Sequence, residues 1–91
     1  MVEISFDPDK RALTLADRGL DFADAAKVFQ GPVFEFDDDR FDYPEPRYST
    51  IGLLEDRMVV VIWTEAEDGR RVISMRKENE REQAKFRGRL A

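Results

Sequence analysis

The chain has 91 residues and a formal net charge of −5, with 42% hydrophobic and 38% charged residues. Residues 1–91 therefore form one domain with a single small core, because a chain this short cannot bury two. It contains no cysteine and no histidine, which excludes disulfides and imidazole chemistry and removes the commonest zinc ligands.

The apolar segments are too short for a membrane protein. The longest apolar run, from Met58 to Trp63, is far below the roughly 20 residues that span a bilayer. The N-terminus is acidic, whereas a signal peptide begins with basic and then apolar residues. We therefore expect a cytoplasmic protein without membrane contact.

Two short helices are predicted in the first third of the chain. Asp7 and Pro8 are a helix-start signal, and Gly19 is typical of the residue that closes a helix. The first helix should run to about Asp17 with a narrow apolar stripe made by Ala12, Leu13, Leu15 and Ala16. A second helix should begin after Asp21 and end before Gly31 and Pro32, carrying Phe22, Ala25, Ala26 and Phe29 inward.

Strand periodicity then replaces helical periodicity. Four strands are predicted at residues 33–36, 48–54, 57–64 and 70–76. The short connections between the last three predict antiparallel pairing, and the apolar run before Thr64 predicts a central strand covered on both faces. A third helix is predicted at residues 78–89. The fold class is α+β, with two N-terminal helices and a C-terminal helix around a mainly antiparallel four-stranded sheet.

The charge changes sign along the chain. Residues 1–69 contain 7 Lys and Arg against 17 Asp and Glu, a net charge of −10, whereas residues 70–91 contain 8 against 3, a net charge of +5. Such a domain can approach a polyanion with its basic end while its acidic body repels it.

Arg76 is the first candidate for a site. Strict alternation along the last strand places Arg71, Ile73 and Met75 on one face, with Ile73 and Met75 meeting the helices, and Val72, Ser74 and Arg76 on the other. Arg76 then lies beside the third helix, where Arg81 and either Glu78 or Glu80 can reach it. A structural ion pair and a functional arginine are equally good interpretations of this placement.

Other candidates are less specific. Arg47 begins a strand and, if the strands pair as predicted, can converge with Arg76 on one phosphate, although by itself it is a solvated edge residue. Trp63 can stack on a base, but a tryptophan in the most apolar strand more often belongs to the core. The acidic run at residues 37–39 with Asp42 lacks the spacing of a calcium loop and is better explained as an exposed loop. Lys10 lies on the polar side of the first helix.

The order of several short motifs resembles the BrnT family of type II toxins. The motifs are Phe6-Asp7-Pro8-x-Lys10, Gly19-Leu20-x-Phe22-x-x-Ala25 with Val28-Phe29, Glu45-x-Arg47 before Ile51-Gly52, and Ile73-Ser74-x-Arg76 with Glu80-Arg81. The resemblance covers nearly the whole chain. It implies a small ribonuclease toxin with a RelE-like fold, held inactive by an antitoxin whose other portion, of the ribbon-helix-helix type, binds DNA.

Three positions depart from what is common in that family. The chain has Thr14 where asparagine is common, Arg18 where histidine is common, and Phe86 where tyrosine is common. Histidine and tyrosine are natural proton carriers in a ribonuclease site. Their absence bears directly on catalysis.

Two hypotheses about function follow. In the first, the chain is a metal-independent endoribonuclease without a cofactor, since the RNA supplies its own 2′-hydroxyl nucleophile. The predicted catalytic residues are Arg47, Arg76, Lys10 and Glu80, with Arg81, Trp63 and Arg18 as RNA contacts. In the second, the chain is a catalytically weak homologue that acts as a protein-binding module. In both, the partner is the antitoxin, and this chain does not bind DNA itself.

Overall fold

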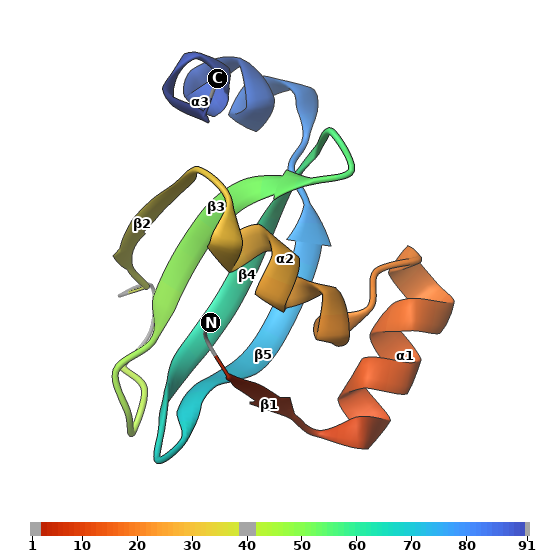
Figure 1. Cartoon of the computed structure of the whole chain (residues 1–91), viewed down its shortest axis with the longest axis vertical. Coiled ribbons are helices and arrows are strands. Elements are labelled where there is room, and N and C mark those ends of the chain that lie inside the picture. Colours follow the sequence, from red (N-terminus) through yellow and green to blue (C-terminus); the bar gives the residue numbers. More distant parts are fainter. Residues whose placement is uncertain (1–2, 39–41, 91) are drawn as a thin grey trace.

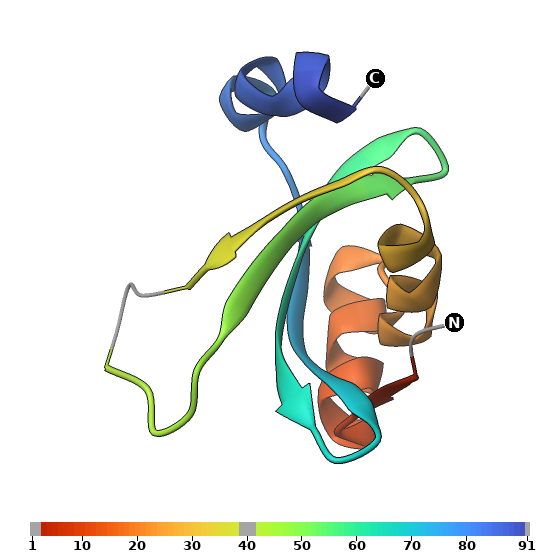
Figure 2. The ribbon, with the colours of Figure 1, turned by 60° about the vertical axis from the view of Figure 1, so that its left-hand side comes forward.

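The structure, a computed structural model, describes residues 3–38 and 42–90. The elements in chain order are β1 (Ile4–Phe6), α1 (Pro8–Arg18), the short 3₁₀ helix η1 (Phe22–Asp24), α2 (Ala25–Gln30), β2 (Val33–Asp37), β3 (Tyr48–Leu54), β4 (Arg57–Ala66), β5 (Gly69–Lys77) and α3 (Glu80–Leu90). The α+β class is as predicted. Figures 1 and 2 show α1 and α2 on one side of a twisted sheet and α3 beyond its far end.

The sheet has five strands rather than the four predicted; it is mainly antiparallel, as predicted, with one parallel pair. Its order is β1-β5-β4-β3-β2, and β1 pairs with β5 in parallel. The sequence prediction was wrong here because β1 has only three residues, too few to show a period-two pattern. The three other pairings, β2 with β3, β3 with β4 and β4 with β5, are antiparallel, as expected for the last three strands.

The central strand β4 separates two hydrophobic clusters. Its residues Val59, Val61 and Trp63 join the cluster under α2, together with Met75 and Phe22. The alternate side chains of β4 face the opposite side of the sheet, where Phe86 of α3 closes a smaller cluster. The buried members of that cluster are Ile51, Met58, Val60, Ile62 and Phe86. The prediction of a central strand covered on both faces is thus confirmed.

A β-bulge changes the alternation along β5. The register with β4 shifts between Ile62 and Trp63, so that Ser74 pairs with Ile62 but Val72 pairs with Trp63. The extra residue is Ile73, and it packs against the smaller cluster rather than with Met75. The prediction that Ile73 and Met75 share the helix-facing side was therefore wrong, since a bulge is invisible to a strict period of two.

Local signals account for the bounds of α1. The Asp7 side chain accepts a hydrogen bond from the backbone N–H of Asp9 at 2.9 Å, and Gly19 closes the helix with a φ of 68°. The guanidinium of Arg11 then donates to both carboxylate oxygens of Asp21, at 2.7 and 2.9 Å. This ion pair fixes α1 to the beginning of η1, and it holds the pKa of Asp21 down to about 2.

The apolar stripe of α1 is not buried. None of the residues of α1 is buried, and the side chains of Leu13 and Leu15 are 69% and 45% exposed. The helix is instead held by polar contacts, the Arg11–Asp21 pair at one place and Arg18 at the other.

Within the residues that the structure describes, none of the helices is both long and apolar enough to cross a membrane.

We predict that Gly52→Ala destabilises the fold. A Cβ at Gly52 would lie 2.7 Å from Cγ1 of Val28 and 3.2 Å from Cγ1 of Val33. The substitution should lower the free energy of unfolding by about 1–3 kcal/mol, because α2 would have to move off the sheet. Urea unfolding measures this. The matched control is Gly88→Ala, which meets open space and should leave stability unchanged or slightly raised. Equal effects of the two substitutions would contradict this account of the α2 contact.

Candidate functional site

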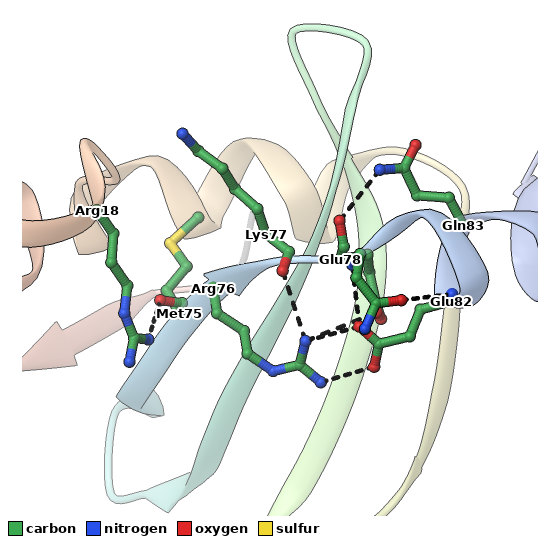
Figure 3. Close-up of polar contacts among 8 residues, drawn as sticks. Arg18, Met75, Arg76, Lys77, Glu78, Glu82 and Gln83 are labelled. Atoms are coloured by element: carbon green, nitrogen blue, oxygen red, sulfur yellow. Dashed lines mark hydrogen bonds and ion pairs between the residues drawn. The ribbon is translucent and has the colours of Figure 1, made fainter.

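Arg76 lies near the end of β5 and is clamped by α3. Its Nη1 and Nη2 donate to the two carboxylate oxygens of Glu82, each at 2.9 Å, and its Nη1 lies 3.7 Å from Oε2 of Glu78 (Figure 3). The sequence analysis proposed Glu78 or Glu80 as the partner of Arg76. Glu78 does approach it, but the bidentate partner is Glu82, whereas Glu80 and Arg81 are exposed at the start of α3.

Glu82 also fixes the beginning of α3. Its backbone N–H donates to the Asn79 side chain at 2.8 Å, and its carboxylate accepts from the Asn79 backbone N–H at 3.0 Å. This reciprocal pair is a capping box, with Asn79 as the capping residue. One carboxylate therefore joins the start of the helix to the arginine of the strand. The hydrogen bonds from Arg76 hold the pKa of Glu82 well below its usual range.

Glu78 is a buried carboxylate beside the same arginine. Its side chain is 1% exposed, and in the described part of the chain its Oε2 has no hydrogen-bond partner. Its backbone is fixed on both sides, since its N–H donates to Met58 and its carbonyl accepts from Gln83, each at 3.0 Å. Burial, with the neighbouring Glu82 carboxylate, raises the pKa of Glu78 to about 7. Glu78 can therefore gain or lose a proton near neutral pH.

A cleft of about 310 Å³ lies between α3 and the sheet at this point. Its charged lining residues are Asp37, Asp38, Glu78, Glu82, Arg76 and Lys85. Four carboxylates thus face two cationic groups. While α3 covers Arg76, this cleft is unfavourable for a polyanion.

A second hollow lies on the other side of β5, against α1. This groove has a volume of about 570 Å³ and is lined by Lys10, Leu13, Thr14, Ala16, Asp17, Arg18, Ile73 and Ser74. Nη1 of Arg18 donates to the Met75 carbonyl at 2.9 Å, so the guanidinium lies at the edge of β5 (Figure 3). Lys10 and Arg18, predicted separately, are thereby brought to one groove.

Ser74 connects the groove with Arg76. The two residues are two positions apart on one strand, so their side chains lie on the same face with about 7 Å between their Cα atoms. The strip of β5 from Ile73 to Arg76 is thus bordered by α1 on one side and by α3 on the other. We take this strip, the groove of α1 and the Arg76 cluster together as the candidate site.

Arg47 does not join this site. The register pairs Tyr48 with Trp63 and Arg76 with Val60, so Arg47 lies two strands away from Arg76 and about 13 Å further along the sheet. Its guanidinium lies over the ring of Tyr43, 3.9 Å from the centroid, and pairs with Glu45 at 3.1 Å. The two arginines therefore do not converge on one phosphate in this structure.

Trp63 is a core residue and not an exposed platform. It is 6% exposed, its Nε1 donates to the Thr50 hydroxyl at 2.8 Å, and its ring packs against Phe29 and Tyr48. The guanidinium of Arg70 covers it at 4.1 Å from the ring centroid. A base cannot stack on this ring without displacing these neighbours.

The described part of the acidic loop forms no group of metal ligands. Among the residues that the structure describes, no group of three or more Asp, Glu, His or Cys side chains is placed to hold a metal ion. Asp39, part of the acidic run, lies outside the described residues. Tyr43 donates a long hydrogen bond of 3.4 Å to Asp38 in this loop.

Comparison with known protein families identifies the chain. The sequence model for the ribonuclease toxin BrnT, of type II toxin-antitoxin systems, matches residues 6–82. The chain belongs to this family. A search of curated protein sequences found no match. Membership of a toxin-antitoxin family implies that this BrnT protein has an antitoxin partner.

The three positions at which departures from the BrnT pattern were expected from the sequence lie in two places. Thr14 and Arg18 both line the groove of α1, next to Lys10 and Ser74. Phe86 instead lies in the smaller cluster, 8% exposed, with its ring centroid 5.3 Å from that of Phe34. The groove thus contains two of these three positions.

Glu78 was expected near Arg76 from the sequence, but the bidentate partner of Arg76, Glu82, was missed. A signal for Glu82 was present, because Asn79 followed three residues later by a glutamate is a capping-box pattern. Nothing in the sequence shows that Glu78 is buried. The catalytic roles of Arg47, Arg76, Lys10 and Glu80 stay predictions.

We predict that Glu78 makes stability depend on pH. Its pKa rises from 4.5 in the unfolded chain to about 7 on folding, so the folded state loses stability as the pH rises from about 4.5 through about 7. Glu78→Gln removes this effect. The variant should match the unsubstituted protein at pH 5 and exceed it at pH 8 by about 1–3 kcal/mol in the free energy of unfolding, measured with urea. Glu82 stays ionised throughout this pH range, because its pKa lies well below its usual range, so parallel stability curves would contradict the assignment.

Proposed function

We propose that this BrnT protein is a metal-independent endoribonuclease in which Arg76 binds the phosphate that is cleaved. The observation that carries the proposal is the fork of Arg76, which already binds the two oxygens of an anionic group at 2.9 Å each. A phosphate presents two oxygens in a similar arrangement, so the Glu82 carboxylate stands where the phosphate would bind. When Glu82 is displaced, the phosphate takes the place of its carboxylate on Arg76.

The reaction requires no group beyond the protein and the RNA. The 2′-oxygen of a ribose attacks the adjacent phosphorus, and the bond from phosphorus to the 5′-oxygen of the next nucleotide breaks. The products are a 2′,3′-cyclic phosphate and a 5′-hydroxyl. One proton leaves the 2′-hydroxyl and another reaches the departing oxygen, so a base and an acid are needed. Arg76, with Arg81 in support, stabilises the added negative charge.

The proton carrier is assigned among three residues. Lys10 and Glu80 follow from the sequence, and Glu78 follows from its burial and its raised pKa. Glu78 is the best placed of these, because its Oε2 lies 3.7 Å from Nη1 of Arg76. A carboxyl group with a pKa near 7 exchanges protons efficiently at neutral pH.

Lys10 and Arg18 are proposed as contacts along the RNA backbone. Both line the groove that leads along β5 toward Arg76. Neither reads a base in this arrangement, so their contribution is electrostatic and should fall with salt concentration. Arg47 and Trp63 lie away from this path, and we propose no direct role for them in cleavage.

We further propose that the antitoxin has a ribbon-helix-helix portion that binds DNA, and that this chain does not bind DNA. Residues 1–69 carry a net charge of −10, which disfavours a broad DNA surface on the toxin. When the antitoxin neutralises the toxin, it should cover the same arginines that bind RNA.

A second function is favoured by specific observations. Phe86 is buried and, unlike tyrosine, has no hydroxyl that could carry a proton. The cleft beside Arg76 is lined by more carboxylates than cationic groups among the described residues. A homologue with these features can bind its antitoxin without cleaving RNA efficiently. Purified protein should then leave RNA intact but still form the complex.

The two functions are separated by a pair of substitutions in one ion pair. Arg76→Ala should lower cleavage of a synthetic RNA roughly 100- to 1000-fold, because it removes the phosphate contact. Glu82→Gln breaks the same pair but leaves the guanidinium, so cleavage should be kept or raised. Both variants weaken the clamp on α3, since each removes one charge of the Arg76–Glu82 pair. Thermal melting therefore supplies the folding control.

The assay is run in EDTA, with a second RNA that has a 2′-deoxyribose at the cleaved position. Cleavage of the first RNA only is expected. Arg76→Lys should recover part of the activity, since it keeps the charge but not the paired donors. Equal losses in Arg76→Ala and Glu82→Gln would identify the pair as structural. Absence of cleavage by the unsubstituted protein, with complex formation intact, would favour the binding module.

A further inference from the structure

The edge of β5 beside α1 is only half paired. β1 pairs with residues 70–72 of β5, and the described strands include no neighbour on that side for residues 73–77 (Figure 1). The Met75 carbonyl points to this open side, where Nη1 of Arg18 covers it. Because residues two apart direct their backbone groups to the same side, the N–H of Lys77 faces the same open edge. An open strand edge is a template for pairing with another chain.

The helix that borders this edge offers apolar side chains that the fold does not use. Leu13 lines the groove and is 69% exposed, and Leu15, on the same helix, is 45% exposed. The attachment of α1 depends on polar contacts, so these leucines are not needed to hold the helix in place. An apolar contact and a strand edge therefore lie side by side.

The charges around the edge favour an acidic occupant. Lys10 and Arg18 line the groove and Lys77 ends the open strand, whereas Asp17 is the one acidic residue among the groove's described lining. A second copy of this chain, paired edge to edge, would bring Arg18 and Lys77 against their own equivalents. Like charges placed opposite each other disfavour that dimer.

We propose that an extended acidic segment of the antitoxin adds to the sheet along residues 73–77 of β5, with an apolar side chain packed on Leu13. This inference rests on the proposed function, since it names the surface through which the antitoxin acts on the RNA groove. About five residues of the segment match the open edge, a length of about 17 Å. One carboxylate of the antitoxin segment would bind the Arg18 guanidinium in place of the Met75 carbonyl.

The added strand would neutralise the toxin by occupying the groove that RNA uses. RNA phosphates gain from Lys10 and Arg18 but gain nothing from the Leu13 side chain. The antitoxin segment gains from all three. Leu13 therefore distinguishes the two ligands, and a neutral polar substitution there should weaken antitoxin binding more than it weakens RNA cleavage.

The test measures affinity for the cognate antitoxin, by titration calorimetry, and RNA cleavage in parallel. Leu13→Gln should weaken antitoxin binding roughly tenfold, because it removes the apolar contact without changing the charge of the groove. Glutamine is nearly as good a helix former as leucine, so α1 should persist. The matched control is Leu53→Gln, on another exposed leucine outside the groove, and it should leave the affinity unchanged.

Lys77→Pro tests the strand edge itself. Proline removes the N–H that faces the open side, so antitoxin affinity should fall, whereas Lys77→Ala removes only the charge and should cost less. Amide exchange at Met75 and Lys77 should slow in the complex. Thermal melting reports any variant that fails to fold, and if Lys77→Pro does not fold, the Leu13→Gln result decides the question alone.

Several outcomes would overturn the docking site. These are unchanged affinity in Leu13→Gln, a loss of RNA cleavage in that variant that exceeds its loss of antitoxin affinity, and a homodimer of the free chain that Leu13→Gln dissociates. Absence of any complex with the antitoxin would overturn it as well. If the unsubstituted protein binds the antitoxin but does not cleave RNA, the ribonuclease proposal fails while the affinities still report on the docking site.

Discussion

The burial of β4 on both faces is the constraint on which the rest of the structure depends. Alternate side chains of this strand enter two separate clusters, so any slip by one residue would exchange the two faces completely. The register of β5 is fixed against this strand, with the bulge opposite Ile62 and Trp63. The position of Arg76 opposite Val60 follows from that register, and with it the location of the site.

The two helices that border the site are held less firmly than the sheet that carries it. α1 buries none of its residues and is attached by the side chains of Arg11 and Arg18. α3 places Phe86 in the smaller cluster and is otherwise joined through the Arg76 clamp. Elements with few buried apolar contacts open at a lower free energy than the core. This arrangement suits a site that must exchange an internal carboxylate for a ligand.

The basic end of the chain does not form one continuous basic surface. Arg70 is placed over the rings of Trp63 and Phe29 and pairs with Glu35 at 3.1 Å, at the end of the sheet away from Arg76. Arg76 is itself matched by carboxylates from its own segment of the chain. The net charge of residues 70–91 therefore overstates the field that a ligand would meet, because folding pairs several of these cations with acidic residues.

The sequence by itself determined the α+β class, the two hairpins that end in β4 and β5, the bounds of α1 to within about one residue, and the family. These features depend on local signals, such as the Asp7 cap, Gly19 and the apolar run of β4, which act over a few residues. Only the tertiary structure decided the parallel strand β1, the bulge at Ile73, the separation of Arg47 from Arg76, and the burial of Glu78. Each of these features depends on contacts between distant segments of the chain or on a register shift. Such contacts and shifts leave no periodic signal in the sequence.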